Sequence, residues 1–174
     1  MYVITYFKSA KDYTIQFSDL GELLMEMSYQ EKSIFGSLVA MLVVYGYYFA
    51  AVLHNIGKPE FAATGLGRLI LAVIAIIVIE VVYHIVLALE SKPEAKDERD
   101  ILIESKAYRN AYFALSTGAF LVIASVIAAD LARDAAPTRI VVTPFLVVNL
   151  VLLFMVLAEV VKLVTQLLHY RRGF

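Results

Sequence analysis

Four long blocks of apolar residues, separated by short charged segments, dominate the pattern along the chain. The blocks cover approximately residues 33–53, 69–89, 111–129 and 144–164. Each is close to the roughly 20 residues that a helix needs to cross a hydrocarbon core about 30 Å thick. The second block has eleven consecutive apolar positions, from Leu69 to Ile79, so it lacks the polar face of a soluble helix. The pattern therefore predicts four transmembrane helices.

These blocks predict an all-α fold, a polytopic membrane protein in which four transmembrane helices form a bundle. We expect residues 1–32 to form an N-terminal segment, residues 33–165 the transmembrane domain, and residues 166–174 a C-terminal tail. A charged loop over residues 90–110 connects the second and third spans. A soluble helical bundle is the competing interpretation, and the absence of polar faces in the blocks argues against it.

Three segments carry signals that begin a helix. Ser28 and Glu31 have the spacing of a capping box, in which each side chain accepts a hydrogen bond from the other residue's backbone amide. Thr143 can cap a helix whose first residue is Pro144. The segment 97–100, Asp-Glu-Arg-Asp, can begin a helix ahead of the third span, because acidic side chains favour the positive end of the helix dipole.

The distribution of lysine and arginine predicts the orientation in the membrane. With four spans, the N-terminal segment, the middle loop and the C-terminal end share one side, which carries eleven basic residues against four on the other. Because basic residues concentrate on the cytoplasmic side, we expect both termini in the cytoplasm. The eleven are Lys8, Lys11, Lys32, Lys92, Lys96, Arg99, Lys106, Arg109, Lys162, Arg171 and Arg172, and the four are Lys58, Arg68, Arg133 and Arg139.

The segment before the first span predicts a short amphipathic helix. Its apolar residues recur at helical spacing, opposite acidic ones. An acidic polar face suits packing beneath the bundle or against a partner better than contact with anionic lipid. The apolar positions are Leu20, Leu23, Leu24 and Met27, and the acidic positions are Asp19, Glu22 and Glu26.

Residues 91–110 form the most charged stretch of the chain. Asp97, Asp100 and Glu104 have the spacing of one helix face. The simplest interpretation is a solvated helix that continues into the third span, and the functional alternative is a docking surface for a cytoplasmic protein. A divalent-ion site has little support, because exposed carboxylates lack an enclosing shell. The docking candidates are Asp97, Glu98, Arg99, Asp100 and Glu104.

Three ionisable residues lie inside the apolar blocks, where unpaired charges are costly and therefore mark candidate sites. Glu80 and His84 share one face of the second span, and Glu159 lies in the fourth. Both spans run inward, so His84 and Glu159, each about five residues from the inner end, should lie at one level. Lys162 is placed to pair with Glu159. Counting inward along the other spans, we expect Ser37, Ser116 and Thr117 in the same layer.

This predicted polar cluster can exchange protons, hold a counter-charge, or coordinate a metal through nitrogen and oxygen ligands. Metal binding is the weakest of these alternatives, because the chain lacks the repeated Glu-x-x-His units of di-metal helical bundles. A structural hydrogen-bonded clasp between helices is the interpretation that requires no function.

Aromatic and small residues suggest two further contacts. The chain has no tryptophan, so we expect Tyr47 and Tyr48 to anchor the outer membrane boundary. Ala114 and Gly118 form a small-xxx-small pattern, which predicts a close approach of two helices.

Composition excludes several classes of function. A net charge of −1 leaves no basic field for nucleic acid, and the absence of cysteine excludes disulfides, thiolate metal sites and cysteine nucleophiles. No nucleophile motif, glycine-rich phosphate loop or zinc-binding repeat is present. We therefore expect no enzyme activity and no cofactor. The N-terminal residues lack the pattern of a removable signal peptide, so the first span is expected to direct insertion.

Two charged motifs carry a resemblance to a known kind of protein. Residues 28–33, Ser-Tyr-Gln-Glu-Lys-Ser, precede the first span, and residues 97–100 with Tyr108-Arg109-Asn110 precede the third. In these motifs the chain resembles small four-span bacterial inner-membrane proteins of unknown function. The resemblance implies a bacterial inner-membrane setting and supplies no catalytic residues.

Two functions remain open from the sequence. The leading interpretation is a non-enzymatic inner-membrane protein that acts through cytoplasmic protein contacts or by self-association. The alternative is a proton-coupled small-solute transporter or channel that uses the Glu80, His84 and Glu159 cluster. The expected partners are the lipid bilayer and a cytoplasmic protein or a second copy.

Overall fold

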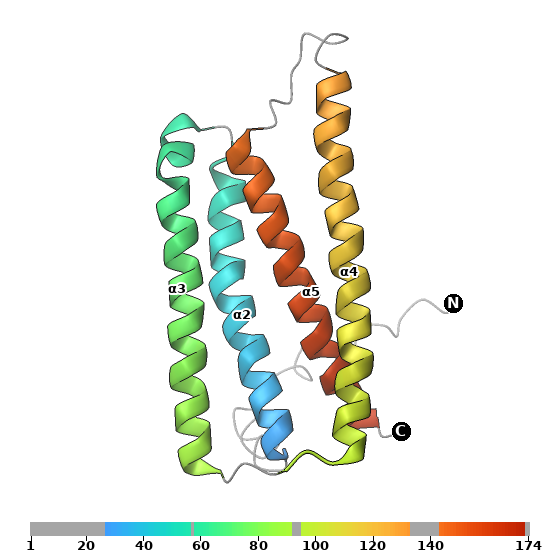
Figure 1. Cartoon of the computed structure of the whole chain (residues 1–174). Coiled ribbons are helices and arrows are strands. Elements are labelled where there is room, and N and C mark those ends of the chain that lie inside the picture. Colours follow the sequence, from blue (N-terminus) through green and yellow to red (C-terminus); the bar gives the residue numbers. More distant parts are fainter. Residues whose placement is uncertain (1–26, 57, 92–94, 133–142, 173–174) are drawn as a thin grey trace, which may run out of the picture.

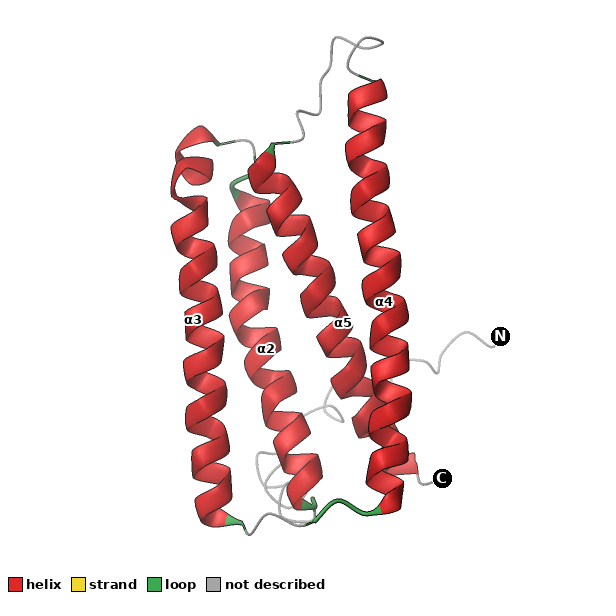
Figure 2. Cartoon of the chain, viewed as in Figure 1, coloured by secondary structure: helices red, strands yellow, loops and turns green. Residues whose placement is uncertain are grey.

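A computed structural model describes residues 27–56, 58–91, 95–132 and 143–172. Within these residues the chain forms α-helices and no strand (Figures 1 and 2), so the predicted all-α fold is confirmed. All four helices are long and apolar enough to cross a membrane. They are α2 (Tyr29–His54), α3 (Pro59–Glu90), α4 (Glu98–Leu131) and α5 (Pro144–Arg172). The amphipathic helix predicted at the N-terminus lies outside the described residues, except for Met27, which is buried.

The four helices stand roughly side by side, with α3 at one edge, α4 at the other, and α2 and α5 between them (Figure 1). Helix α4 packs most extensively on α5, and α2 contacts both α3 and α5. Helix α3 touches α5 only briefly, and α3 and α4 do not pack along their lengths. We call the end at which α2 and α4 begin, and α3 and α5 finish, the lower end.

The predicted helix starts are present in the structure. The Ser28 hydroxyl accepts from the Glu31 amide at 3.2 Å, and the Glu31 carboxylate accepts from the Ser28 amide at 3.0 Å. Asp97 and Asp100 form a second capping box, with amide-to-carboxylate distances of 2.7 Å and 3.0 Å. The Thr143 hydroxyl accepts from the Leu146 amide at 3.2 Å, with Pro144 as the first helical residue.

Helix α4 is continuous from the charged stretch into the third span. It contains 34 residues, so it is about 50 Å long at 1.5 Å per residue. The prediction that a helix continues from the charged stretch into the third span is therefore confirmed. At the lower end, the first turns of α4 stand beside α5, where Asn110 Nδ2 donates to Thr165 Oγ1 at 3.4 Å.

Glycines permit close approaches between helices. Gly118 of α4 is buried against Phe154 of α5, as its small-xxx-small spacing predicted. Gly36 of α2 lies against the ring of Tyr83 of α3, whose hydroxyl donates to the Lys32 carbonyl at 2.6 Å. At both positions an added Cβ would overlap the aromatic ring.

The upper half of the molecule is closed by a small core. Tyr48 and Val52 of α2 are buried together with Phe61 and Ala72 of α3. Tyr48 also donates to Asn149 Oδ1 of α5 at 2.7 Å. The prediction that Tyr48 anchors the membrane boundary is therefore wrong, because its side chain points inward. Its neighbour Tyr47 is 81% exposed, as an anchor would be.

Candidate functional site

Helices α2 and α3 bring three polar side chains together in the lower half of the molecule. Ser37 Oγ donates to Glu80 Oε2 at 2.7 Å. His84 Nε2 lies 3.2 Å from the same carboxylate oxygen and 3.3 Å from Ser37 Oγ. Glu80 and His84 are one turn apart on α3 and lie on the same helix face, as their spacing predicted. The three side chains thus join α2 to α3.

Helix α5 contributes a second polar pair. Lys162 forms an ion pair with Glu159, one turn away, as predicted. The Lys162 ammonium also lies 5.2 Å from the ring centroid of Tyr108 on α4, within the range of a cation–π contact. This pair therefore contacts α4 but is held on α5.

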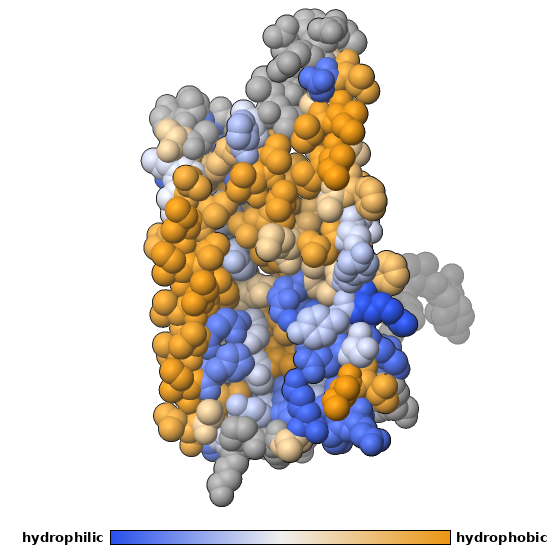
Figure 3. All heavy atoms as spheres, in the orientation of Figure 1, coloured by the Kyte–Doolittle hydropathy of each residue, from blue (hydrophilic) through white to orange (hydrophobic). Residues whose placement is uncertain are grey.

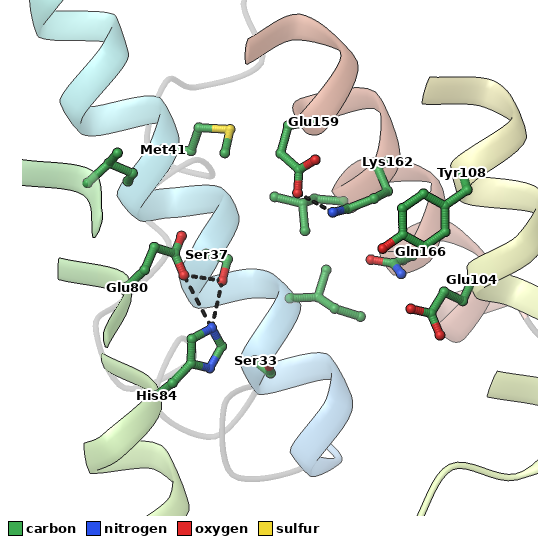
Figure 4. A pocket seen from close by; sticks show the side chains of 13 residues that line it. Ser33, Ser37, Met41, Glu80, His84, Glu104, Tyr108, Glu159, Lys162 and Gln166 are labelled. Carbon is green, nitrogen blue, oxygen red and sulfur yellow. Dashed lines mark hydrogen bonds and ion pairs between the residues drawn. The ribbon is translucent and has the colours of Figure 1, made fainter. Parts of the chain in front are cut away.

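Both polar groups line one cavity of about 450 Å³ (Figure 4). His84 and Glu159 face this common space, so the structure brings together the residues that were expected at one level. All four helices contribute to the lining. We call this space the lower cavity. A direct contact between the α3 group and the α5 pair is not among the interactions of the described residues.

The predicted contribution of α4 to this layer is wrong. Ser116 and Thr117 do not line the cavity, and Thr117 is exposed. Glu104 and Tyr108 occupy the α4 side instead. The prediction counted inward from residue 111, whereas the helix begins at Glu98. Its charged turns therefore stand beside the polar layer, and the register differs from the prediction by eight or more residues, or about 12 Å.

A second cavity of about 230 Å³ adjoins the first toward the lower end. The two share part of their lining, including Ser33, Glu104 and Gln166. The second cavity is also lined by Asp100 and Tyr170, near the start of α4 and the last turn of α5. Polar surface therefore continues from Glu80 and Glu159 to the lower end of the molecule.

Side-chain exposure shows that the polar cluster is not a sealed clasp. The His84 side chain is 43% exposed and that of Glu159 is 39% exposed. Glu80 and Lys162 are more enclosed, at 23% and 16%. These side chains are therefore not enclosed by the protein, and their open surface is available to whatever fills the cavity.

The predicted docking residues have different surroundings. Asp97 and Asp100 cap the start of α4, and Asp100 Oδ1 also accepts from the Tyr170 hydroxyl at 2.6 Å. Glu104 forms a 2.7 Å ion pair with Lys96. The side chains of this acidic face therefore have partners within the chain. Of the remaining candidates, Glu98 and Arg99 are exposed.

Among the described residues, Lys96 and Tyr170 lie outside the predicted spans and have shifted pKa values. The hydrogen bond to Glu104 raises the pKa of Lys96, although partial desolvation opposes the change. Burial, followed by the hydrogen bond to the Asp100 carboxylate, raises the pKa of Tyr170. Both shifts favour the protonated forms, so the Lys96–Glu104 and Tyr170–Asp100 contacts persist through the neutral range.

Sequence reasoning missed the roles of Glu104, Tyr108 and Gln166 in the cavity. Glu104 and Tyr108 are separated by one helical turn, a spacing that could have placed them on one face of α4. Gln166 lies one turn beyond Lys162 on α5. Only the relative register of the helices, which the sequence does not contain, brings these faces together.

Metal coordination has no geometric support in the described part of the chain. It contains no group of three or more His, Asp or Glu side chains placed to hold an ion. Comparison with known proteins adds no ligand set, since no protein-family model, curated protein or solved structure matches the chain.

Proposed function

We propose that the chain is a non-enzymatic integral protein of a bacterial inner membrane that conducts protons through the lower cavity, which a small solute can also enter. Its lower end faces the cytoplasm, a proposal that rests on the eleven basic residues expected on that side against four on the other. The bacterial setting rests on the resemblance in the two charged motifs.

The single observation that carries this proposal is the lower cavity itself. It joins the Glu80–Ser37–His84 group to Glu159 and continues toward the lower end through the adjoining cavity. Imidazole and carboxylate side chains can act as proton donors and acceptors when water reaches them. Ionisable residues inside membrane proteins commonly mark such pathways.

The upper half must open for passage to be complete. The core around Tyr48, Val52, Phe61 and Ala72 closes that half. The cavity therefore belongs to a state that is open toward the lower end. Movement of the upper parts of α2, α3 and α5 would open it toward the upper end. Four spans are few for an alternating-access transporter, so a small rearrangement of this core is the simplest route.

Proton flux into proteoliposomes tests this function. Purified protein is reconstituted in phosphatidylcholine vesicles that contain a pH-sensitive dye, and a potassium diffusion potential drives proton entry. Glu80→Gln and Glu159→Gln should each reduce flux at least about tenfold, since each removes a group that can release a proton. Glu98→Gln is the matched control, because Glu98 is exposed and does not line the cavity. Flux no greater than in empty vesicles, or equal in all variants, would reject the proposal.

A second candidate function is a protein contact at the lower end, through the first turn of α4. The observation in its favour is that Glu98 and Arg99 are exposed there, with Arg99 donating only to the Tyr170 carbonyl at 3.5 Å among the described hydrogen bonds. Copurification from mild detergent should recover a specific partner or a homo-oligomer. Combined reversal of Glu98 and Arg99 should abolish recovery, and unchanged recovery would remove this surface from consideration.

A further inference from the structure

Polar and apolar surfaces meet on α3 at the level of the lower cavity. Glu80 and His84 line the cavity, whereas Ile85 and Leu89, which do not line it, are 56% and 82% exposed. On the facing side, α4 carries the charged stretch that begins at Glu98, and Glu104 and Tyr108 line the cavity. Figure 3 shows apolar side chains along the outer side of α3, a hydrophilic patch on its inner side in the lower half, and polar side chains over the lower half of α4 and α5. An apolar and a polar surface therefore lie side by side at one level.

The cavity is open on the side between α3 and α4. Helices α3 and α4 are the two edges of the row and do not pack along their lengths. On α3, Ile77 and Val81 neighbour Glu80 and are 55% and 53% exposed. A ligand that enters from this side meets apolar α3 surface and the polar cavity together. A fully hydrated solute gains no binding free energy from the apolar surface, whereas an amphiphile is stabilised by contacts with both surfaces.

The charges of the cavity favour a cationic head group. Its lining contains three carboxylates, those of Glu80, Glu104 and Glu159, and a single lysine, Lys162. Lys162 is paired with Glu159 and Lys96 with Glu104, whereas the described contacts of Glu80 are with Ser37 and His84 rather than with a lysine or arginine. A cation in the cavity would therefore be attracted chiefly to the Glu80 carboxylate.

We infer that the lower cavity binds an amphiphile with a primary ammonium head, the head between Glu80 and Glu159 and the alkyl chain along α3 at Ile77 and Val81. This inference rests on the proposed function and names the class of solute for the same site. The chemistry is shared by an aminophospholipid of the surrounding leaflet and by a free alkylamine, and both sources present the same ammonium group.

Ligand binding to the full chain tests the inference without any proton gradient. Protein in phosphatidylcholine nanodiscs is titrated with dodecylamine, and the thermal unfolding midpoint is followed, because a ligand of the folded state raises it by mass action. Dodecanol has the chain without the ammonium, and ethylamine has the ammonium without the chain. Dodecylamine should bind at least about tenfold more tightly than either. Equal affinity for ethylamine or for dodecanol would overturn the inference.

Variants show whether binding occurs at this site. Combined Glu80→Gln and Glu159→Gln should weaken dodecylamine binding at least about tenfold, whereas Glu98→Gln should leave it unchanged. Val81→Ser should weaken dodecylamine binding and leave that of ethylamine unaltered, because only the alkyl chain reaches Val81. The comparison of ligands on the unaltered chain remains decisive if a variant fails to fold. Dodecylamine affinity unchanged in the double variant would also overturn the inference.

Replacement of part of the phosphatidylcholine by phosphatidylethanolamine distinguishes the two sources. If phosphatidylethanolamine weakens dodecylamine binding, the natural ligand is the aminophospholipid. If dodecylamine affinity is undiminished, the natural ligand is a free alkylamine. Failure of the inference is separable from failure of the proposed function. Flux that depends on Glu159 without selective amine binding would reject the inference alone, whereas selective binding without flux would reject proton movement alone.

Discussion

At the scale of single residues, polar side chains within the apolar layer are hydrogen-bonded inside the protein. Tyr48 donates to Asn149 of α5 at 2.7 Å, and the Asn149 amide donates to the Phe145 carbonyl of its own helix at 2.8 Å. In hydrocarbon such groups have no water to bond, so the Tyr48–Asn149 bond also fixes how α2 and α5 face each other. Among the described residues, no fully buried side-chain polar atom is left without a hydrogen bond.

Replacement of Tyr48 by phenylalanine should therefore destabilise the upper core. The substitution removes the donor to Asn149 and leaves that buried acceptor short of a partner. We expect a loss of about 1 kcal/mol, measured by thermal or denaturant unfolding in detergent. Tyr47→Phe is the control, because Tyr47 is 81% exposed and should leave stability unchanged. Equal effects of the two substitutions would contradict the buried contact.

Tyr170 should make stability depend on pH in the alkaline range. Burial and the Asp100 carboxylate raise the pKa of Tyr170 above its ordinary value of about 10. Below about pH 10 the Tyr170 hydroxyl is protonated in both the folded and the unfolded chain, and its contribution to stability is fully present. As pH rises further, the unfolded chain ionises first and this stability is lost. The unfolding midpoint of the wild type should thus be higher than that of Tyr170→Phe at about pH 8, and this difference should be smaller at about pH 11. A constant difference would contradict this.

Some of these contacts could be predicted from spacing along the sequence, and others could not. The Ser28–Glu31 box and the Glu80–His84 pair depend on positions within one helix, so the sequence is enough to place them. The Tyr48–Asn149 bond depends on the rotation of two helices about their axes. Because α2 and α5 are apolar nearly all round, hydrophobic periodicity does not specify that rotation.

At the scale of elements, the four helices agree with the apolar blocks but extend beyond them. Helix α4 begins at Glu98, well ahead of the predicted third span at residue 111. The number and direction of the helices could be predicted because a bilayer imposes a minimum length. The relative register of the helices could not be predicted, because a helix can extend beyond the membrane with charged turns at no free-energy cost in water. Consequently Glu104 and Tyr108, rather than Ser116 and Thr117, face the lower cavity.

The packing of α4 on α5 should be sensitive to one small side chain. Gly118→Ala places a Cβ on the ring of Phe154 and should destabilise the protein by about 1–3 kcal/mol, as overpacking does. Gly46→Ala is the matched control, since a Cβ there meets nothing within 4 Å. It should stabilise helix α2 by up to about 1 kcal/mol. Unfolding midpoints in detergent measure both, and a stabilising Gly118→Ala would refute this contact.

At the scale of the whole molecule, an open row of helices presents a closed upper core and a polar lower half. We propose that the lower end faces the cytoplasm. The chain has no cysteine, so single cysteines can report the orientation. In intact cells a membrane-impermeant maleimide should label Lys58→Cys, between α2 and α3, but not Glu98→Cys, and both should react after lysis. The opposite pattern would reverse the proposed topology.

Water access to the lower cavity is the property on which both proposals depend, and the reactivity of a cysteine at Ser37 measures it. Ser37 lines the cavity, whereas Val52 is buried in the upper core. A charged methanethiosulfonate reagent added to the lower side requires a hydrated thiolate. Ser37→Cys should therefore react at least about tenfold faster than Val52→Cys, whose thiol is shielded by packed side chains. Equal, slow reaction at both positions would show that no aqueous cavity reaches the polar cluster.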